Sequence, residues 1–166
     1  MKKKRVVILD KEKIDRKLRR MAYEIWERNA DEQEITLIGI EKGGKTVAEN
    51  LGQLVREISP LIVHVLSVTI NKKSPLNHAL DVKQNLTDRS IVVVDDVANS
   101  GKTITYSLHA ILSFNVKKIM VAVLVDRKHK SFPIASDIVG LSLATTLQEH
   151  IEVEIKGGVI MSVYLE

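Results

Sequence analysis

The chain has 166 residues, of which 45% are hydrophobic and 28% are charged. This balance is typical of a folded globular protein and excludes intrinsic disorder and fibrous repeats. The length is close to the usual size of one domain, so we expect residues 1–166 to form a single domain. The sequence contains no cysteine, which excludes disulfide bonds, thiolate nucleophiles and cysteine-bound zinc or iron–sulfur clusters.

Positive charge is concentrated at the start of the chain. The formal net charge is +4, yet residues 1–20 alone hold ten Lys or Arg against three Asp or Glu. The basic character therefore belongs to the N-terminal segment, and an aromatic content of 4% argues against stacking of single-stranded bases as the main role. The early apolar run Val6–Leu9 is too short for a signal peptide or a membrane span, which predicts a cytoplasmic protein with no membrane partner.

Apolar runs and periodic apolar faces alternate along the chain. A strand at residues 6–9 precedes a helix that Asp10 caps and whose buried stripe is Ile14, Leu18, Met21 and Ile25. Further strands are predicted at residues 35–40, 61–70, 91–94 and 119–125, and further helices at residues 46–58 and 103–114. Residues 71–89 are polar and predict a long connection or flap. Strands that alternate with helices imply an α/β fold whose parallel sheet is covered on both faces.

The pattern changes in the last quarter of the chain. Residues 137–143 alternate in polarity, and residues 159–165 follow two adjacent glycines, Gly157 and Gly158. These features predict short β segments and a terminal hairpin. We therefore expect a small β hood at the C-terminal end.

The first candidate phosphate-binding loop covers residues 39–46 and lies between a predicted strand and a predicted helix. Loops in this position present backbone N–H groups to anions at the carboxyl edge of a parallel sheet. The segment matches the P-loop pattern G-x-x-x-x-G-K-[ST], so a P-loop small-molecule kinase is one reading of the sequence.

A second loop follows the buried strand at residues 91–94. Asp95 and Asp96 end that strand, and a short turn with Ser100 and Thr103 then opens a helix. Carboxylates accept hydrogen bonds from vicinal sugar hydroxyls, while the amides and hydroxyls of such a turn can surround a phosphate. A sugar phosphate satisfies both halves of this loop.

Residues 91–103, IVVVDDVANSGKT, resemble the phosphoribosyl diphosphate (PRPP) binding signature of type I phosphoribosyltransferases. The resemblance implies a central, mainly parallel sheet flanked by helices with a small C-terminal β hood. It also implies transfer of ribose 5-phosphate from PRPP to a nucleobase with release of diphosphate. Residues 41–44 are similar to the diphosphate loop of purine-salvage members, which often holds a non-proline cis peptide, expected here at Lys42 and Gly43.

Residues 122–129 and 132–140 resemble the pyrimidine-operon attenuator and uracil phosphoribosyltransferase subgroup, which favours uracil as acceptor and a pyrimidine-responsive regulatory role. Purine-salvage members carry Lys where Asp126 stands and an acid where Asn99 stands. The attenuator subgroup carries Thr-Arg-Gly in place of residues 42–44 and an aromatic residue in place of Asn99. A non-catalytic regulator that binds nucleotide and RNA on the same fold therefore stays open as an alternative.

The resemblance assigns site residues in three groups. The PRPP group consists of Asp95, Asp96, Ala98, Asn99, Ser100, Gly101, Lys102 and Thr103. Within it, Asp95 and Asp96 are also the catalytic residues, since they would bind the ribose and place charge near the developing cation. Lys42, Gly43, Gly44 and Lys72 form the diphosphate group, and Asp126 and Arg127 the base group. The resemblance further implies Mg²⁺, bridged mainly by substrate and water, and a homodimer.

Overall fold

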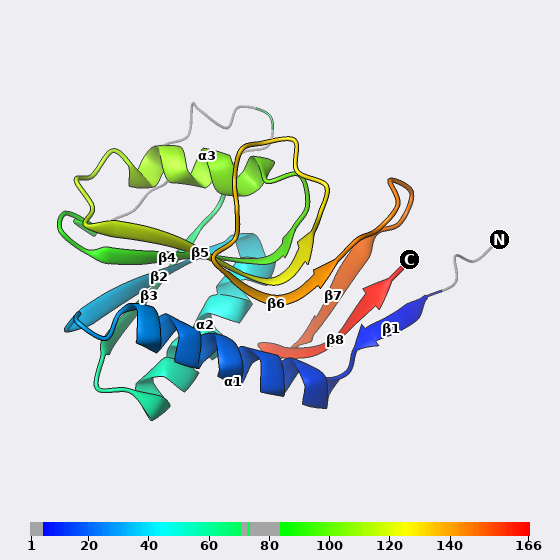
Figure 1. The fold of residues 1–166 in the computed structure, drawn as a ribbon, viewed down its shortest axis with the longest axis horizontal. Coiled ribbons are helices and arrows are strands. Elements are labelled where there is room, and N and C mark those ends of the chain that lie inside the picture. Colours follow the sequence, from blue (N-terminus) through cyan, green and yellow to red (C-terminus); the bar gives the residue numbers. More distant parts are fainter. Residues whose placement is uncertain (1–4, 71–72, 74–83) are drawn as a thin grey trace.

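The computed structural model describes residues 5–70, 73 and 84–166. Within these residues, five strands form a parallel sheet in the order β3-β2-β4-β5-β6 (Figure 1). The strands are β2 (Glu34–Ile40), β3 (Ile62–Val68), β4 (Ser90–Ala98), β5 (Lys118–Arg127) and β6 (Ile138–Leu143). Because parallel strands are buried on both faces, β4 and β5 consist largely of continuous apolar runs.

Helices cover both faces of this sheet. Helices α1 (Lys11–Arg28) and α2 (Glu41–Ile58) pack on one face, and α3 (Lys102–Ile111) packs on the other (Figure 1). Asp10 caps α1 as predicted, since its side chain accepts from Lys13 N at 2.9 Å. The predicted buried stripe of α1 is confirmed: Ile14, Leu18, Met21 and Ile25 are all buried.

A second, antiparallel sheet lies beside the first. It contains β1 (Val6–Leu9), β8 (Val159–Leu165) and β7 (Ile151–Lys156) in the order β1-β8-β7. Gly157 and Gly158 have φ of 57° and 75°, a left-handed conformation that glycine adopts without strain, and they form the β7–β8 turn. This sheet is the predicted β hood, and it also includes the N-terminal strand.

The short β segment predicted at residues 137–143 is confirmed as β6, which is the edge strand of the parallel sheet and pairs with β5. A Cβ on Gly140 would lie 2.4 Å from Leu124 O, so glycine lets β6 approach β5 closely. The alternating pattern reflects the edge position of β6, where alternate side chains remain partly exposed.

The predicted start of α2 and the predicted cis peptide were wrong. The helix begins at Glu41, because packing against β4 overrides the low helix propensity of Gly43 and Gly44. All peptide bonds of the described residues are trans, and the unusual backbone conformation lies instead at Glu41, with φ of 55°. Across the described ranges, no helix has the length and apolar character that a membrane crossing needs.

Candidate functional site

The acid pair lies at the carboxyl end of β4, the central strand. Asp95 is only 8% exposed, and its Oδ1 accepts from Asp96 N at 2.9 Å. Asp96 Oδ1 in turn accepts from Val97 N at 2.8 Å. The strand continues through both acids to Ala98, beyond the predicted end at Val94, so the backbone of the pair is held by the sheet.

The surroundings of Asp95 favour its protonated form. Burial, followed by the negative charge of Asp96, raises the pKa of Asp95 to about 9; the charge of Glu41 adds a smaller contribution. At neutral pH Asp95 therefore carries a proton, and its carboxyl group can both donate and accept hydrogen bonds. A cation bound beside the pair would lower this pKa.

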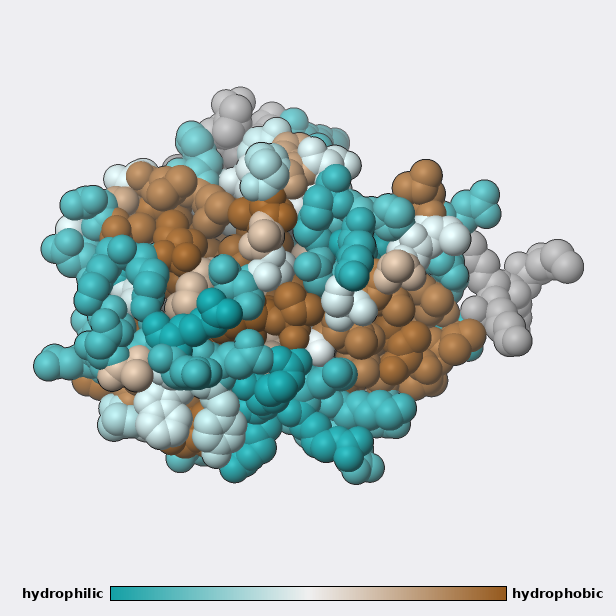
Figure 2. All heavy atoms as spheres, in the orientation of Figure 1, coloured by the Kyte–Doolittle hydropathy of each residue, from teal (hydrophilic) through white to brown (hydrophobic). Residues whose placement is uncertain are grey.

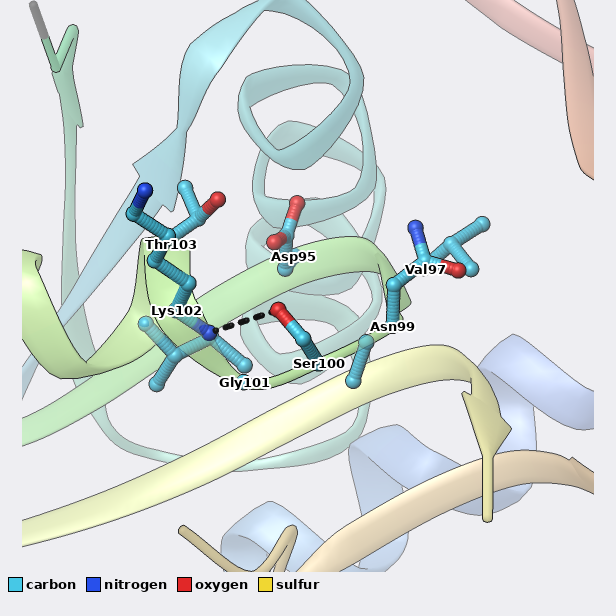
Figure 3. Close-up of a pocket in the computed structure, with 9 residues that line it drawn as sticks. Asp95, Val97, Asn99, Ser100, Gly101, Lys102 and Thr103 are labelled. Atoms are coloured by element: carbon cyan, nitrogen blue, oxygen red, sulfur yellow. Dashed lines mark hydrogen bonds between the residues drawn. The ribbon is translucent and has the colours of Figure 1, made fainter. Parts of the chain in front are cut away.

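A short turn connects the acid pair to α3 and lines a small hollow of about 40 Å³ (Figure 3). The hollow is lined by Asp95, Val97, Ala98, Asn99, Ser100, Gly101, Lys102, Thr103 and Ile104. Gly101, with φ of 82°, is the N-cap of α3, and no side chain caps the helix. The nearest substitute is a long contact of 3.3 Å from Lys102 N to Ser100 Oγ. The uncapped N–H groups and the positive end of the helix dipole make this turn suited to an anion.

The connection between β5 and β6 fastens this turn from outside. Ser131 N and Phe132 N both donate to Ser100 O, at 2.9 and 3.1 Å. A Cβ on Gly101 would lie 2.4 Å from Ile134 Cγ2. The turn is thus clamped between β4 and the β5–β6 connection, and glycine is the residue that this clamp requires.

The first turn of α2 lies against the acid pair. A Cβ on Gly43 would lie 2.2 Å from Asp96 Oδ2, and a Cβ on Gly44 would lie 2.6 Å from Val94 O. No side chain caps α2, and Lys42 is exposed in its first turn. The structure therefore brings the N-terminus of α2 beside the acid pair, which the N-terminus of α3 also adjoins. Lys72, which the sequence also assigns to the diphosphate group, lies outside the described residues.

The start of α2 argues against a P-loop kinase. Helix α2 starts at Glu41, directly after β2, so no loop remains between strand and helix to wrap a triphosphate. Lys45, the lysine of the motif, is exposed and pairs with Glu49 on α2 at 3.8 Å.

Glu41 is a site residue that the sequence reasoning missed. Its Oε1 accepts from Ile70 N at 2.9 Å, which ties the start of α2 to the chain just beyond β3. Its position at the start of the predicted diphosphate loop, residues 41–44, was the available signal. The contact to Ile70, however, joins residues 29 apart in sequence and has no local pattern.

The predicted base residues lie beside the phosphate turn, but both already have partners. Asp126 pairs with Lys130, whose Nζ also donates to Arg127 O at 2.8 Å. Arg127 donates to Asn99 Oδ1, at 3.0 Å, and to the β6–β7 connection. A second hollow of about 320 Å³ lies here, lined by Asn99, Ser100, Arg127, His129, Lys130, Ser131 and Leu147. Sequence reasoning missed Lys130 and Leu147. Their positions beside this hollow depend on how the connections after β5 and β6 fold.

The site offers oxygen ligands suited to Mg²⁺ at the acid pair. Among the described residues, no group of three or more His, Asp or Glu is arranged to enclose a metal ion. The carboxylates of Asp95 and Asp96 are hard oxygen donors, and Mg²⁺ commonly takes one or two carboxylates with the rest of its ligands from substrate and water. These residues fit a metal shared with a phosphorylated substrate.

Fold and hollow together define an α/β protein that binds its ligand at the carboxyl edge of a parallel sheet, beside two helix N-termini. The chain belongs to the phosphoribosyl transferase domain family, whose model matches residues 6–156. It is accordingly a PRPP-dependent phosphoribosyltransferase, and the predicted family and fold are confirmed.

Relatives and solved structures agree with this assignment. The chain is 36% identical to the bifunctional protein PyrR of Roseiflexus sp. (strain RS-1), covering 92% of this chain and 90% of that protein. It is also 36% identical to the bifunctional protein PyrR of Fusobacterium nucleatum, covering 94% of each. The fold is similar to that of the hypoxanthine phosphoribosyltransferase of Trypanosoma cruzi, with a TM-score of 0.80 at 14% identity over 96% of this chain and 94% of that one.

Proposed function

We propose that this chain, acting as one domain over residues 1–166, transfers ribose 5-phosphate from PRPP to uracil in the cytoplasm. The observation that carries the proposal is the acid pair, with Asp95 buried and Asp96 half-buried, beside two uncapped helix N-termini. A substrate with a phosphate, a ribose and a diphosphate has one anion for each helix and hydroxyls for the acids. Uracil is favoured by the resemblance at residues 122–140 and by the relatives called bifunctional protein PyrR.

Asp95 and Asp96 are the proposed catalytic residues. Uracil N1 forms a bond to C1 of the ribose, the bond from C1 to the diphosphate oxygen breaks, and the N1 proton passes to water. Positive charge spreads over C1 and the ring oxygen in the transition state. The carboxyl groups hold the ribose hydroxyls, and negative charge on the pair stabilises that state by an amount on the order of a few kcal/mol.

The N-terminus of α3 and the N-terminus of α2 would each bind a different anionic group of the substrate. The turn from Ala98 through Thr103 holds the 5-phosphate, and Lys42 with the amides of Gly43 and Gly44 holds the diphosphate. Lys72 is proposed to join them. Mg²⁺, held by the carboxylates of Asp95 and Asp96, would neutralise charge on the leaving diphosphate when bound. The base lies beside Asp126 and Arg127.

Diphosphate release from PRPP, measured with Mg²⁺ and one base at a time, tests the proposal. Uracil should be turned over, with hypoxanthine, guanine and xanthine as comparisons. The Asp95→Asn/Asp96→Asn double variant should lose this turnover while keeping its thermal unfolding transition. Binding of PRPP without release from any base would favour the non-catalytic regulator. A chain that PRPP does not protect against thermal unfolding would overturn the proposal.

A second function, RNA binding, is favoured by a cationic hollow on α1. Lys13, Arg16, Lys17 and Arg20 line about 360 Å³ on its surface. Phosphate groups would bind there with an affinity that falls steeply with salt. The Lys13→Gln/Lys17→Gln variant should weaken RNA binding and flatten its salt dependence, whereas Lys45→Gln should change neither. Equal RNA affinity in both variants would contradict this function.

A homodimer is the proposed assembly. Figure 2 shows hydrophobic side chains gathered over the small sheet, on the right of the view. Val6 and Val7 of β1 are 45% and 53% exposed, an apolar surface that a second copy would cover. Light scattering after size exclusion should give twice the chain mass, and Val7→Lys should lower it. A monomeric mass for the wild type would contradict the dimer.

A further inference from the structure

Asn99 lies where the two hollows meet. It lines the first hollow together with Asp95 and Thr103, and it lines the second together with Arg127 and Leu147. Figure 3 shows it on the side of the first hollow away from Thr103. In the transferase reaction proposed above, the base must reach C1 of a ribose held in the first hollow. A base in the second hollow therefore has to pass Asn99.

Arg127 fixes the direction of the Asn99 amide. Its NH1 donates to Asn99 Oδ1 at 3.0 Å, its Nε donates to Thr145 Oγ1 at 2.8 Å, and its NH2 donates to Thr146 O at 3.0 Å. A guanidinium group can only donate, so the amide must present its oxygen to Arg127. The Asn99 NH₂ group then faces away from Arg127, and within the described ranges no acceptor contacts it.

We propose that Asn99 determines base specificity by donating from Nδ2 to a carbonyl oxygen adjacent to the base nitrogen that receives the ribose. The inference rests on the transferase function proposed above. In uracil this oxygen is O2, next to N1. As N1 loses its proton to water and bonds to C1, with the C1–diphosphate bond breaking, the negative charge of the base is shared with O2. A donor at O2 then stabilises the transition state more than the neutral base.

This role differs from that of a general base. The acceptor oxygen of Asn99 is occupied by Arg127, and an amide does not take up a proton at neutral pH. Arg127 is a positioning residue here, because it acts on the base through the orientation of Asn99. Its contacts to Thr145 and Thr146 hold the guanidinium in place.

Thio-substituted uracils test the proposal, because sulfur is a weaker hydrogen-bond acceptor than oxygen. The wild type should turn over 2-thiouracil with a kcat/KM about tenfold below that of uracil. Asn99→Ala should lower kcat for uracil about ten- to hundredfold. It should also reduce the 2-thiouracil discrimination to about twofold or less. The ratio for 4-thiouracil should stay unchanged.

Three further variants and one control test whether the orientation of the Asn99 amide, and not a change in folding, accounts for the discrimination. Asn99→Asp keeps the size of the side chain and an acceptor for Arg127 but has no donor, so it should lose the 2-thiouracil discrimination as Asn99→Ala does. Arg127→Met should lose it too, whereas Arg127→Lys, which still donates to Asn99, should retain part of it. Asn115→Ala, an exposed asparagine beyond the other end of α3, is the control and should behave as the wild type.

The outcomes distinguish this inference from the function on which it rests. No turnover of any base by the wild type refutes the proposed function, and turnover of a base other than uracil refutes the uracil assignment and this inference with it. Turnover of uracil with undiminished 2-thiouracil discrimination in both Asn99 variants overturns the inference alone. Thermal unfolding of each variant confirms that it is folded.

Discussion

Gly43 and Asp96 approach each other so closely that no side chain fits between them: a Cβ on Gly43 would lie 2.2 Å from Asp96 Oδ2. Gly43 lies in the first turn of α2, and Asp96 lies near the end of β4. The contact joins the proposed diphosphate position to the proposed ribose position. The distance between these two parts of the site therefore depends on the absence of a side chain at Gly43.

Gly43→Ala should damage PRPP binding more than folding. The added methyl group must push aside either Asp96 or the first turn of α2, and both belong to the proposed site. We expect the KM for PRPP to rise about tenfold or more, which corresponds to about 1.4 kcal/mol. Steady-state kinetics with varied PRPP measures this effect. Lys45→Ala, on the exposed side of the same helix, is the matched control, and equal KM values for the two variants would contradict the prediction.

Asp95→Asn should change how stability depends on pH. The folded chain keeps the Asp95 proton up to about pH 9, whereas the unfolded chain loses it near the ordinary value of 3.8. The contribution of Asp95 to stability is therefore complete at low pH and is lost as pH rises towards 9. The Asp95→Asn variant does not undergo this loss. The free energy of unfolding of the variant minus that of the wild type should therefore increase with pH, by at most about 1.4 kcal/mol per pH unit.

Urea denaturation at several values between pH 5 and pH 8 measures this difference. Asp15→Asn, at an exposed position on α1, should give a curve parallel to the wild type. The prediction fails when the Asp95→Asn and wild-type curves are also parallel.

Gly101→Ala should be destabilising, and Ile134→Ala should relieve only part of the effect. Alanine at Gly101 has to adopt φ of 82° and brings its Cβ to within 2.4 Å of Ile134 Cγ2. The backbone strain alone costs about 1–3 kcal/mol. In the double variant the contact is removed but the strain remains. The destabilisation of the double variant should therefore be smaller than the sum of the destabilisations of the two single variants. Urea denaturation of the four proteins in the cycle measures the coupling, and strict additivity would contradict the packing described here.

Asp126 and Lys130 should be energetically coupled. Their side chains are 19% and 22% exposed, so removing one partner leaves the other charge partly desolvated. Lys130→Met and Asp126→Asn should each cost about 1–2 kcal/mol, and the double variant should cost less than the sum. Thermal or urea unfolding gives the coupling energy. A value near zero would show that the pair forms no stabilising interaction in solution.

The sequence predicted those features that have a local pattern. The stripe of α1 has helical spacing, and the order of Asp95, Asp96 and the following turn lies within thirteen residues, so both could be recognised. The start of α2 could not, because two glycines indicate a loop unless the packing against β4 is known. The place of β6 depended on pairing with β5, and edge strands and hood strands share one alternating pattern.

The contacts of the site were the least accessible to sequence reasoning. The contact of Arg127 with Asn99 joins residues that are 28 apart in sequence, and the contact of Glu41 with the Ile70 amide joins residues that are 29 apart. The shifted pKa of Asp95 arises from burial and from the charge of Asp96, and adjacency in sequence reveals only the second of these causes. Pairings of this kind follow from how the strand ends converge.

The pairing of β1 with β8 affects how the chain acquires its fold during synthesis. Val6 lies opposite Leu165, so β1 stays unpaired during synthesis until β8, which follows β6 and β7 in chain order, has emerged. The parallel sheet is complete once β6 has emerged, because β6 is its last strand in chain order. Closure of the small sheet is therefore a late, non-local step, and until then the exposed valines of β1 have no partner strand.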